Sequence, residues 1–227
     1  MNKQTKWAKY HTEAGEQVPS VTTIIGRFKD SGGLIFWAFK EGCQQGQEKA
    51  ANPQLSFDLY RDKAAEAGTM AHDMVEAHIK GLPLPELEGS KETIEKANGA
   101  FDAFLKWEKA TKIGIKYTEV PLVSERHKFG GRIDAVGTIG DELILVDWKT
   151  SNSVYADYTL QLAAYQLLWQ ENYPDHQLSG GAHLIRFAKE AGDFSHHHFP
   201  QLDKEAVAFL KMRELYDLMK SIEKRVK

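Results

Sequence analysis

The sequence predicts one α/β domain in which helices flank a mixed central β-sheet. Two helix-forming segments come first, three strand-forming segments follow, and the remainder alternates as helix, two strands and helix. The chain of 227 residues is long enough for a sizeable core, and no repeat, low-complexity tract or linker separates a second domain. We expect residues 61–227 to form the domain, and residues 1–60, the least periodic part, to form a helical N-terminal arm or cover of the same unit.

Helical periodicity and end signals place the predicted helices. Ser20 or Thr22 starts a short first helix, and Gly81 and Pro83 end the next one. The last helix is expected to begin with Asp203 as its cap. Beyond the N-terminal region, the expected helices span residues 61–80, 91–112, 157–170 and 203–224.

The predicted strands are short runs rich in β-branched and aromatic residues, bounded by turn residues. Residues 142–146 are almost continuously apolar, which is typical of a central strand covered on both faces. A helix between the third and fourth strands favours a mixed sheet. The expected strands span residues 115–122, 132–139, 142–149, 181–187 and 194–199.

Composition excludes several classes of protein. The single cysteine, Cys43, forms no internal disulfide and cannot supply the cysteine set of a zinc or iron–sulfur site, so a metal would need O and N ligands. The net charge of −3 excludes a polycation, and a nucleic acid would be held by a local patch or by bound cations. The longest nearly apolar run, residues 34–39, is far shorter than a membrane helix of about 20 residues. We therefore expect a cytoplasmic protein without membrane contact.

Residues 132–149 predict a β-hairpin that brings two carboxylates together. Gly140 and Asp141 form its two-residue turn, because glycine adopts the positive φ that such turns require. With these two residues as the loop, Asp134 lies directly opposite Asp147. Directly opposed residues on one face have Cβ atoms about 4.5–5.5 Å apart, and like charges there are destabilising. We expect a positive group between the two aspartates.

Arg132 and Lys149 share the face of these aspartates, because side chains alternate along a strand with period two. One interpretation is a lattice of surface ion pairs, Asp134 with Lys149 and Arg132 with Asp147, which would contribute little to stability. The other is a divalent-cation site for phosphoryl chemistry. The apolar run before Asp147 favours the second interpretation, because it leads the charges into a cleft.

Further polar side chains are candidates to complete such a site. A lone inward-facing histidine is more often a core residue, but the aspartate pair favours His72 as a metal ligand, with Glu76 four residues on as a candidate to orient its ring. Gln161 and Tyr165 share one helix face, which by itself is typical of a partly buried helix. Glu119, on the strand before the hairpin, is equally a solvated strand residue or an accessory carboxylate.

Two conspicuous features are not expected to carry chemistry. His196, His197 and His198 are adjacent on a strand and point to alternating faces, so the three cannot converge on one ion. We interpret them as surface residues. Cys43 has no neighbour in the sequence that indicates a nucleophile.

Four motifs, taken in order and spacing, resemble those of the PD-(D/E)XK nuclease superfamily, in particular its RecB-like and Cas4-like exonuclease branch. Residues 18–23 and Trp37 add a looser resemblance to the N-terminal region of phage-encoded and mitochondrial-type single-chain members. The motifs are Gly-Thr-Met-Ala-His ending at His72, Gly-Gly-Arg-Ile-Asp ending at Asp134, Val-Asp-Trp-Lys-Thr around Asp147 and Lys149, and Gln-Leu-Ala-Ala-Tyr from Gln161 to Tyr165.

The resemblance implies a restriction-endonuclease-like core and phosphodiester hydrolysis of DNA that depends on Mg²⁺ or Mn²⁺. Its members with an iron–sulfur cluster carry four cysteines, which this chain lacks. Carried over by motif, Lys149, Asp134 and Asp147 are the catalytic residues, and Gln161 and Tyr165 help to position DNA. The implied metal ligands are His72, Asp134, Asp147 and the carbonyl of Trp148, with Glu119 and Glu76 as accessory residues.

The resemblance favours a metal-dependent DNA exonuclease that leaves 5′-phosphate and 3′-hydroxyl ends, in a bacterial or phage-infected cell. Alternatives are a structure-selective DNA endonuclease and a non-catalytic DNA-end binding or recombination accessory protein. The expected partner is DNA, as a single strand or duplex end, with a single-strand-binding or recombination protein as a further candidate. Lys29, Trp37, Phe39 and Lys40 either line a path for a DNA strand or pack within the domain.

Overall fold

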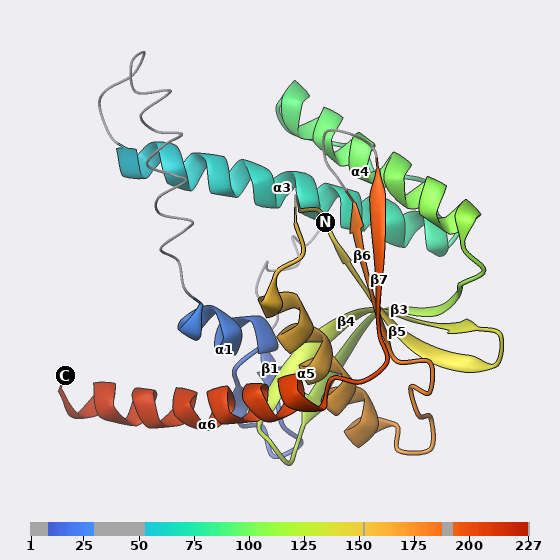
Figure 1. Ribbon diagram of the computed structural model, residues 1–227. Helices are drawn as coiled ribbons and strands as arrows, with labels where there is room; N and C mark the ends of the chain where they lie inside the picture. Colours follow the sequence, from blue (N-terminus) through green and yellow to red (C-terminus); the bar gives the residue numbers. More distant parts are fainter. Residues whose placement is uncertain (1–8, 30–52, 152, 188–192, 227) are drawn as a thin grey trace.

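The structure is a computed structural model that describes residues 9–29, 53–151, 153–187 and 193–226. A five-stranded mixed sheet carries helices on both faces (Figure 1), which confirms the predicted α/β fold. In the described part of the chain, no helix combines the length and apolar character that crossing a membrane requires.

The central sheet follows the chain order of its strands. Its strands are β3 (Gly114–Ser124), β4 (Phe129–Ile139), β5 (Glu142–Lys149), β6 (Ala182–Phe187) and β7 (Phe194–Phe199). They are ordered β3-β4-β5-β6-β7, and β5 and β6 are parallel whereas the other neighbours are antiparallel. The predicted hairpin is confirmed, because Gly140 turns with φ of 59° and β4 pairs with β5 in the expected register from Ile139 with Glu142 to Ala135 with Val146.

The helices begin where polar side chains satisfy their first amide groups. The described helices are α1 (Val21–Phe28), α3 (Pro53–Ile79), α4 (Lys91–Ala110), α5 (Ala156–Asn172) and α6 (Asp203–Arg225). The Ser20 hydroxyl accepts the Thr23 amide at 3.0 Å and so caps α1 as expected. The predicted cap of α6 is wrong, because Asp203 is already its first helical residue and Leu202 precedes it without a side-chain cap. Asp203 still places a negative charge at the positive end of the helix dipole.

Side chains that alternate along β5 enter two separate cores. Leu145 packs with residues of α1, α5 and α6, whereas Ile144 and Val146 pack with residues of α3 and α4. All three side chains are fully buried. Figure 1 shows the same division, with α3 and α4 on one side of the sheet and α1, α5 and α6 on the other. The prediction that β5 is covered on both faces is therefore confirmed.

The described N-terminal residues pack on the sheet. A two-stranded sheet of β1 (Tyr10–His11) and β2 (Gln17–Val18) precedes α1, and the Gly130 amide donates to the Pro19 carbonyl at 3.0 Å. Val21 and Ile24 of α1 are buried in the core shared with α5 and α6. Residue 60, the expected limit of the arm, falls inside α3. Trp37, Phe39, Lys40 and Cys43 lie outside the described residues.

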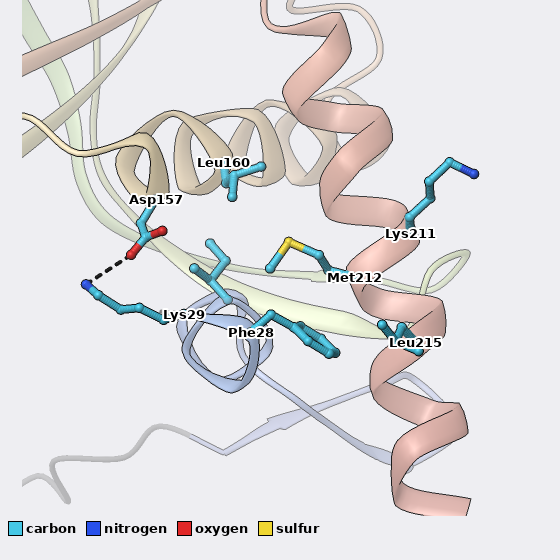
Figure 2. Close-up of a pocket in the computed structure, with 8 residues that line it drawn as sticks. Phe28, Lys29, Asp157, Leu160, Lys211, Met212 and Leu215 are labelled. Carbon is cyan, nitrogen blue, oxygen red and sulfur yellow. Dashed lines mark ion pairs between the residues drawn. The ribbon is translucent and has the colours of Figure 1, made fainter. Parts of the chain in front are cut away.

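A pocket lies between α1, α5 and α6, away from the hairpin aspartates (Figure 2). Its wall is mostly apolar, with Phe28, Leu160 and Met212 among the lining side chains. Lys29 and Asp157 form an ion pair of 3.0 Å at its edge. Lys29 is thus paired at the surface of the domain, and its place in a path for DNA stays a prediction.

Candidate active site

Three carboxylates form a row across three neighbouring strands. Thr118 pairs with Ala135 and Val120 with Ile133, so Glu119 of β3 lies opposite Asp134 of β4. Across the next gap, Asp134 and Asp147 would form the pair after Ala135 and Val146. The row occupies the end of β5 that the sequence indicated.

The β4–β5 ladder ends immediately before the two aspartates. Its last pair is Ala135 with Val146, and the Trp148 amide then donates to the Asp134 carboxylate at 3.1 Å. The sequence-based register therefore brings Asp134 and Asp147 together, but the strands part at this point. A side-chain carboxylate takes the place of a backbone carbonyl as the acceptor, and this anchors Asp134 to β5.

Asp147 is fully buried, and its Oδ1 has no hydrogen-bond partner among the described residues. Its Oδ2 is paired with Lys149, whose Nζ lies 2.6 Å away. Burial raises the pKa of Asp147 to about 7, against the opposing effect of Lys149. A buried carboxylate with one oxygen left without a hydrogen bond fits a cation ligand better than a purely structural ion pair.

Lys149 stays cationic in this setting. Burial acts to lower its pKa, but the neighbouring charges of Asp147 and Asp134 outweigh burial and raise it. The Tyr158 ring lies 5.4 Å from the ammonium and adds a cation–π contact. Lys149 therefore presents a positive charge and hydrogen-bond donors beside the acidic row.

His72 approaches the acidic row from α3. Single ligand atoms of His72, Glu119 and Asp134 all lie within 4.8 Å of one another, which is compatible with a shared metal ion. Burial lowers the pKa of His72 to about 4, so the ring is in the neutral form that binds metals. Gly68 permits this close approach, because a Cβ at that position would lie 2.8 Å from Oγ1 of Thr150 after β5.

Glu119 reaches the row through an unusual backbone conformation. Its φ of 54° is in the left-handed region, which is uncommon for a residue other than glycine. Burial, followed by the charge of Asp134, raises the pKa of Glu119 to about 7. Arg132 Nε lies 2.6 Å from its Oε2 and partly balances this charge. Of the two interpretations of Glu119, a solvated strand residue or an accessory carboxylate, the geometry favours the accessory carboxylate.

Gln161 and Tyr165 of α5 form a hydrogen-bonded pair beside the acids. The Gln161 amide nitrogen lies 2.7 Å from the Tyr165 hydroxyl. Tyr165 is only 4% exposed, and burial with the charges of Asp134 and Asp147 raises its pKa well above the usual value. Gly131 makes room for this ring, since a Cβ there would lie 2.8 Å from Tyr165 Cε1. The pair therefore faces the carboxylates instead of exposing polar tips to solvent.

Two expected contacts differ from the observed ones. Glu76 pairs with Lys80, and among the described hydrogen bonds none joins Glu76 to the His72 ring. The ring instead has a hydrogen bond with the backbone of Trp148. The lattice of surface ion pairs is not found either, because Lys149 pairs with Asp147 and Arg132 with Glu119. The predicted lattice does not form because Asp147 is buried and pairs with Lys149 of its own strand.

The histidine run is on the surface as expected, but a residue of another strand joins it. His196 and His198 are exposed, and both contact the ring of His183 on β6. The ring nitrogens Nδ1 of His183 and Nε2 of His196 are 2.8 Å apart. Sequence separation hid this contact, since only the pairing of β6 with β7 brings His183 next to the run.

Two solved structures of low sequence identity are similar to parts of this chain. A protein from Eubacterium rectale, provisionally named an exonuclease, matches 67% of this chain and 66% of its own at 14% identity and a TM-score of 0.46. The alkaline exonuclease LHK-Exo of Laribacter hongkongensis matches 73% of this chain and 92% of its own at 13% identity and a TM-score of 0.32. No curated protein matches the sequence.

A family model supplies the assignment that these distant structures do not carry. The model of the PD-(D/E)XK nuclease superfamily matches residues 57–225, which include nearly all of α3, the whole central sheet and all of α6. The matched region contains the acidic row, His72, Lys149 and the Gln161–Tyr165 pair. The chain belongs to the PD-(D/E)XK nuclease superfamily.

Proposed function

We propose that this nuclease is a DNA exonuclease that depends on Mg²⁺ or Mn²⁺ and leaves 5′-phosphate and 3′-hydroxyl ends. The observation that carries the proposal is the buried Asp147 carboxylate beside Asp134, which is paired with Lys149 through Oδ2 and has no described hydrogen-bond partner at Oδ1. Such a group costs stability unless a cation or substrate uses it. Membership of a nuclease superfamily supports DNA as the substrate.

His72, Asp134 and Asp147 are the proposed metal ligands, with Glu119 as an accessory carboxylate and the Trp148 carbonyl as a further oxygen ligand. Neutral imidazole and carboxylates are a suitable donor set for Mg²⁺ or Mn²⁺. The metal, when bound, neutralises phosphate charge and lowers the pKa of a water molecule. The clustering of the His72, Glu119 and Asp134 ligand atoms within 4.8 Å supports His72, Asp134 and Glu119 in these roles, whereas Asp147 is outside this group and its role is supported by its burial beside Lys149.

The remaining residues are proposed to orient the substrate and stabilise charge. Lys149, which is held cationic, would donate to a nonbridging phosphate oxygen or to the attacking water, where it stabilises developing negative charge. The Gln161 and Tyr165 pair would position the DNA backbone beside the carboxylates. Their mutual hydrogen bond fixes both side chains before substrate arrives.

Incubation with end-labelled linear DNA and with covalently closed circular DNA tests the proposal. With Mg²⁺ we expect shortening of linear DNA, intact circles and 5′-phosphate products, and with EDTA no cleavage. Cleavage of circles would indicate an endonuclease instead. Binding of DNA ends without any cleavage would indicate a non-catalytic accessory protein.

The Lys149→Ala variant links the activity to the site. We expect loss of cleavage of about 100-fold or more, because a preorganised charge on the reacting phosphate is removed. Circular dichroism verifies that the variant keeps its fold. A cleavage rate equal to that of the unmodified protein would refute the assignment of Lys149.

A further inference from the structure

Two tyrosines at the start of α5 extend from Lys149 towards solvent. The Tyr158 ring centroid lies 5.4 Å from Lys149 Nζ, and the Tyr155 centroid lies 5.5 Å from that of Tyr158. The two ring planes meet at 82°, which is the edge-to-face arrangement of a favourable aromatic pair. The rings thus form a continuous path that begins at the proposed catalytic lysine.

Packing in the core accounts for one of the two tyrosines but not for the other. Tyr158 is partly buried and packs against the main core, so hydrophobic burial accounts for it. Tyr155 is 51% exposed, and it occupies the N-cap position without a side-chain hydrogen bond to the helix. Tyr165 on the same helix is 4% exposed. Neither core packing nor helix capping therefore explains an aromatic residue at position 155.

The position of Tyr155 suits a base in the same strand as the reacting phosphate. The two contacts together place its ring within about 11 Å of Lys149 Nζ. This corresponds to about three nucleotides at the rise of 3.4 Å per residue of a stacked strand, and to fewer in an extended strand. An exposed ring held edge-on by a neighbour offers a face on which any base can stack.

We propose that Tyr155, supported by Tyr158, is a stacking platform for an unpaired nucleobase close to the cleaved phosphate. The inference rests on the proposed nuclease function and adds a substrate form to it. Bases inside a duplex are stacked on both faces by their neighbours, so the platform accepts bases of a single strand or of a frayed end. The described site therefore favours single-stranded over fully paired termini.

Steady-state cleavage of a fluorescent single-stranded oligonucleotide tests the platform. Replacement of a stacking aromatic residue by alanine weakens binding by about 5- to 100-fold. We expect Tyr155→Ala to raise KM by this factor with little change in kcat, and Tyr155→Trp to restore the KM. Tyr117→Ala is the matched control, since Tyr117 is 55% exposed but lies on β3 with its ring near Trp169, and its KM should not change.

Oligonucleotides with one abasic position each separate this inference from the proposed function. Fluorescence anisotropy in EDTA measures their binding without cleavage. We expect one abasic position to weaken binding to the unmodified protein but not to Tyr155→Ala. Equal losses in both proteins, or an unchanged KM in Tyr155→Ala, would overturn the platform even if DNA is cleaved. Absence of all cleavage with position-dependent binding intact would overturn the proposed activity and leave the platform supported.

Discussion

Two polar clusters on the same sheet differ in whether their buried polar atoms have hydrogen-bond partners. On β3 to β5, Oδ1 of the buried Asp147 has no hydrogen-bond partner in the described residues. On β6 and β7, both ring nitrogens of the buried His183 have partners, His196 at 2.8 Å and the Gly180 carbonyl at 3.2 Å, and the ring stacks on His198 at 4.4 Å. The acidic cluster is therefore unsatisfied, and the histidine cluster is satisfied.

This difference separates a site from a structural element more reliably than residue type does. Histidine is the commonest metal-binding side chain, yet the ring nitrogens of His183 are already engaged by His196 and by the Gly180 carbonyl. Among the described residues, the one group of three or more whose ligand atoms lie close together is His72, Glu119 and Asp134. A buried polar group that the protein does not satisfy indicates a ligand, whereas a satisfied one contributes to stability.

The largest expected effect breaks the acidic cluster. Asp147→Asn should reduce cleavage of linear DNA by about 1,000-fold or more, because it removes a proposed metal ligand. Its free energy of unfolding should change little, because removal of a buried carboxylate charge offsets the loss of the ion pair with Lys149, whose charge Asp134 still balances. Initial rates with Mn²⁺ and urea unfolding in EDTA measure the two quantities.

Asp141→Asn is the control for this change. Asp141 lies in the turn between the same two strands, but it is exposed, so both rate and stability should stay close to those of the unmodified protein. A marked loss of stability in Asp147→Asn would contradict the comparison, because Asp147 would then be a structural residue like His183.

The two clusters should also give stability opposite dependences on pH in the absence of metal. Burial lowers the pKa of His183 to about 4, so the unfolded chain binds a proton first as pH falls below 6.5, and stability is lost from there down to about 4. The full effect is about 3 kcal/mol. Asp147 has its pKa raised to about 7, so its contribution is present at low pH and lost as pH rises through 7.

Urea unfolding across this pH range, with single variants, resolves the two contributions. His183→Gln should remove the loss of stability that occurs as pH falls from 6.5 to about 4, and Asp147→Asn should remove the opposing loss that occurs as pH rises from 3.8 to about 7. Cleavage by His183→Gln near neutral pH should be unaffected. His176→Gln, at an exposed position, is the control and should leave the profile as it is. An acid side that is equally steep in His183→Gln would show that other groups govern it.

The acidic site could be predicted to the extent that it follows from local register. The Gly140 and Asp141 turn sets the pairing of β4 with β5, and the aspartates follow from it by counting. The point where β4 and β5 separate could not be predicted by counting residues. It depends on the Trp148 amide, which donates to the Asp134 carboxylate. Lys149 was placed correctly on the face of Asp147, but its choice of partner depended on burial.

Features that rest on long-range packing were outside the reach of the sequence. The φ of 54° at Glu119 has no local signature, and a register shift between Ile115 and Tyr117 precedes it. His183 meets the histidine run only through the β6–β7 pairing. Both features can be predicted only when the arrangement of the strands is known. By contrast, the period of two along one strand was enough to predict the alternating faces of His196 to His198.

The smallest expected effect concerns Glu119, which is intermediate between the unsatisfied Asp147 and the satisfied His183. Its carboxylate is near His72 and Asp134, but Arg132 already balances it at 2.6 Å. Asp147 also has a cationic partner, Lys149 at 2.6 Å, but its buried Oδ1 has no hydrogen-bond partner among the described residues, so we expect Glu119 to contribute less to metal binding than Asp147. Glu119→Gln should therefore raise the Mn²⁺ concentration for half-maximal cleavage by about 10-fold, with a smaller effect on the rate at saturating Mn²⁺.

Calorimetric titration with Mn²⁺ measures the same change without DNA, and Glu142→Gln, at the exposed start of β5, should bind Mn²⁺ like the unmodified protein. If Glu119→Gln also binds Mn²⁺ normally while Asp134→Asn does not, Glu119 serves Arg132 and is not a metal ligand. If Glu119→Gln loses binding as severely as Asp147→Asn, the ion pair with Arg132 does not weaken Glu119 as a ligand. An intermediate loss would show that a carboxylate contributes less to Mn²⁺ binding the more fully protein neighbours already pair with it. The contrast between the acidic and histidine clusters requires this result.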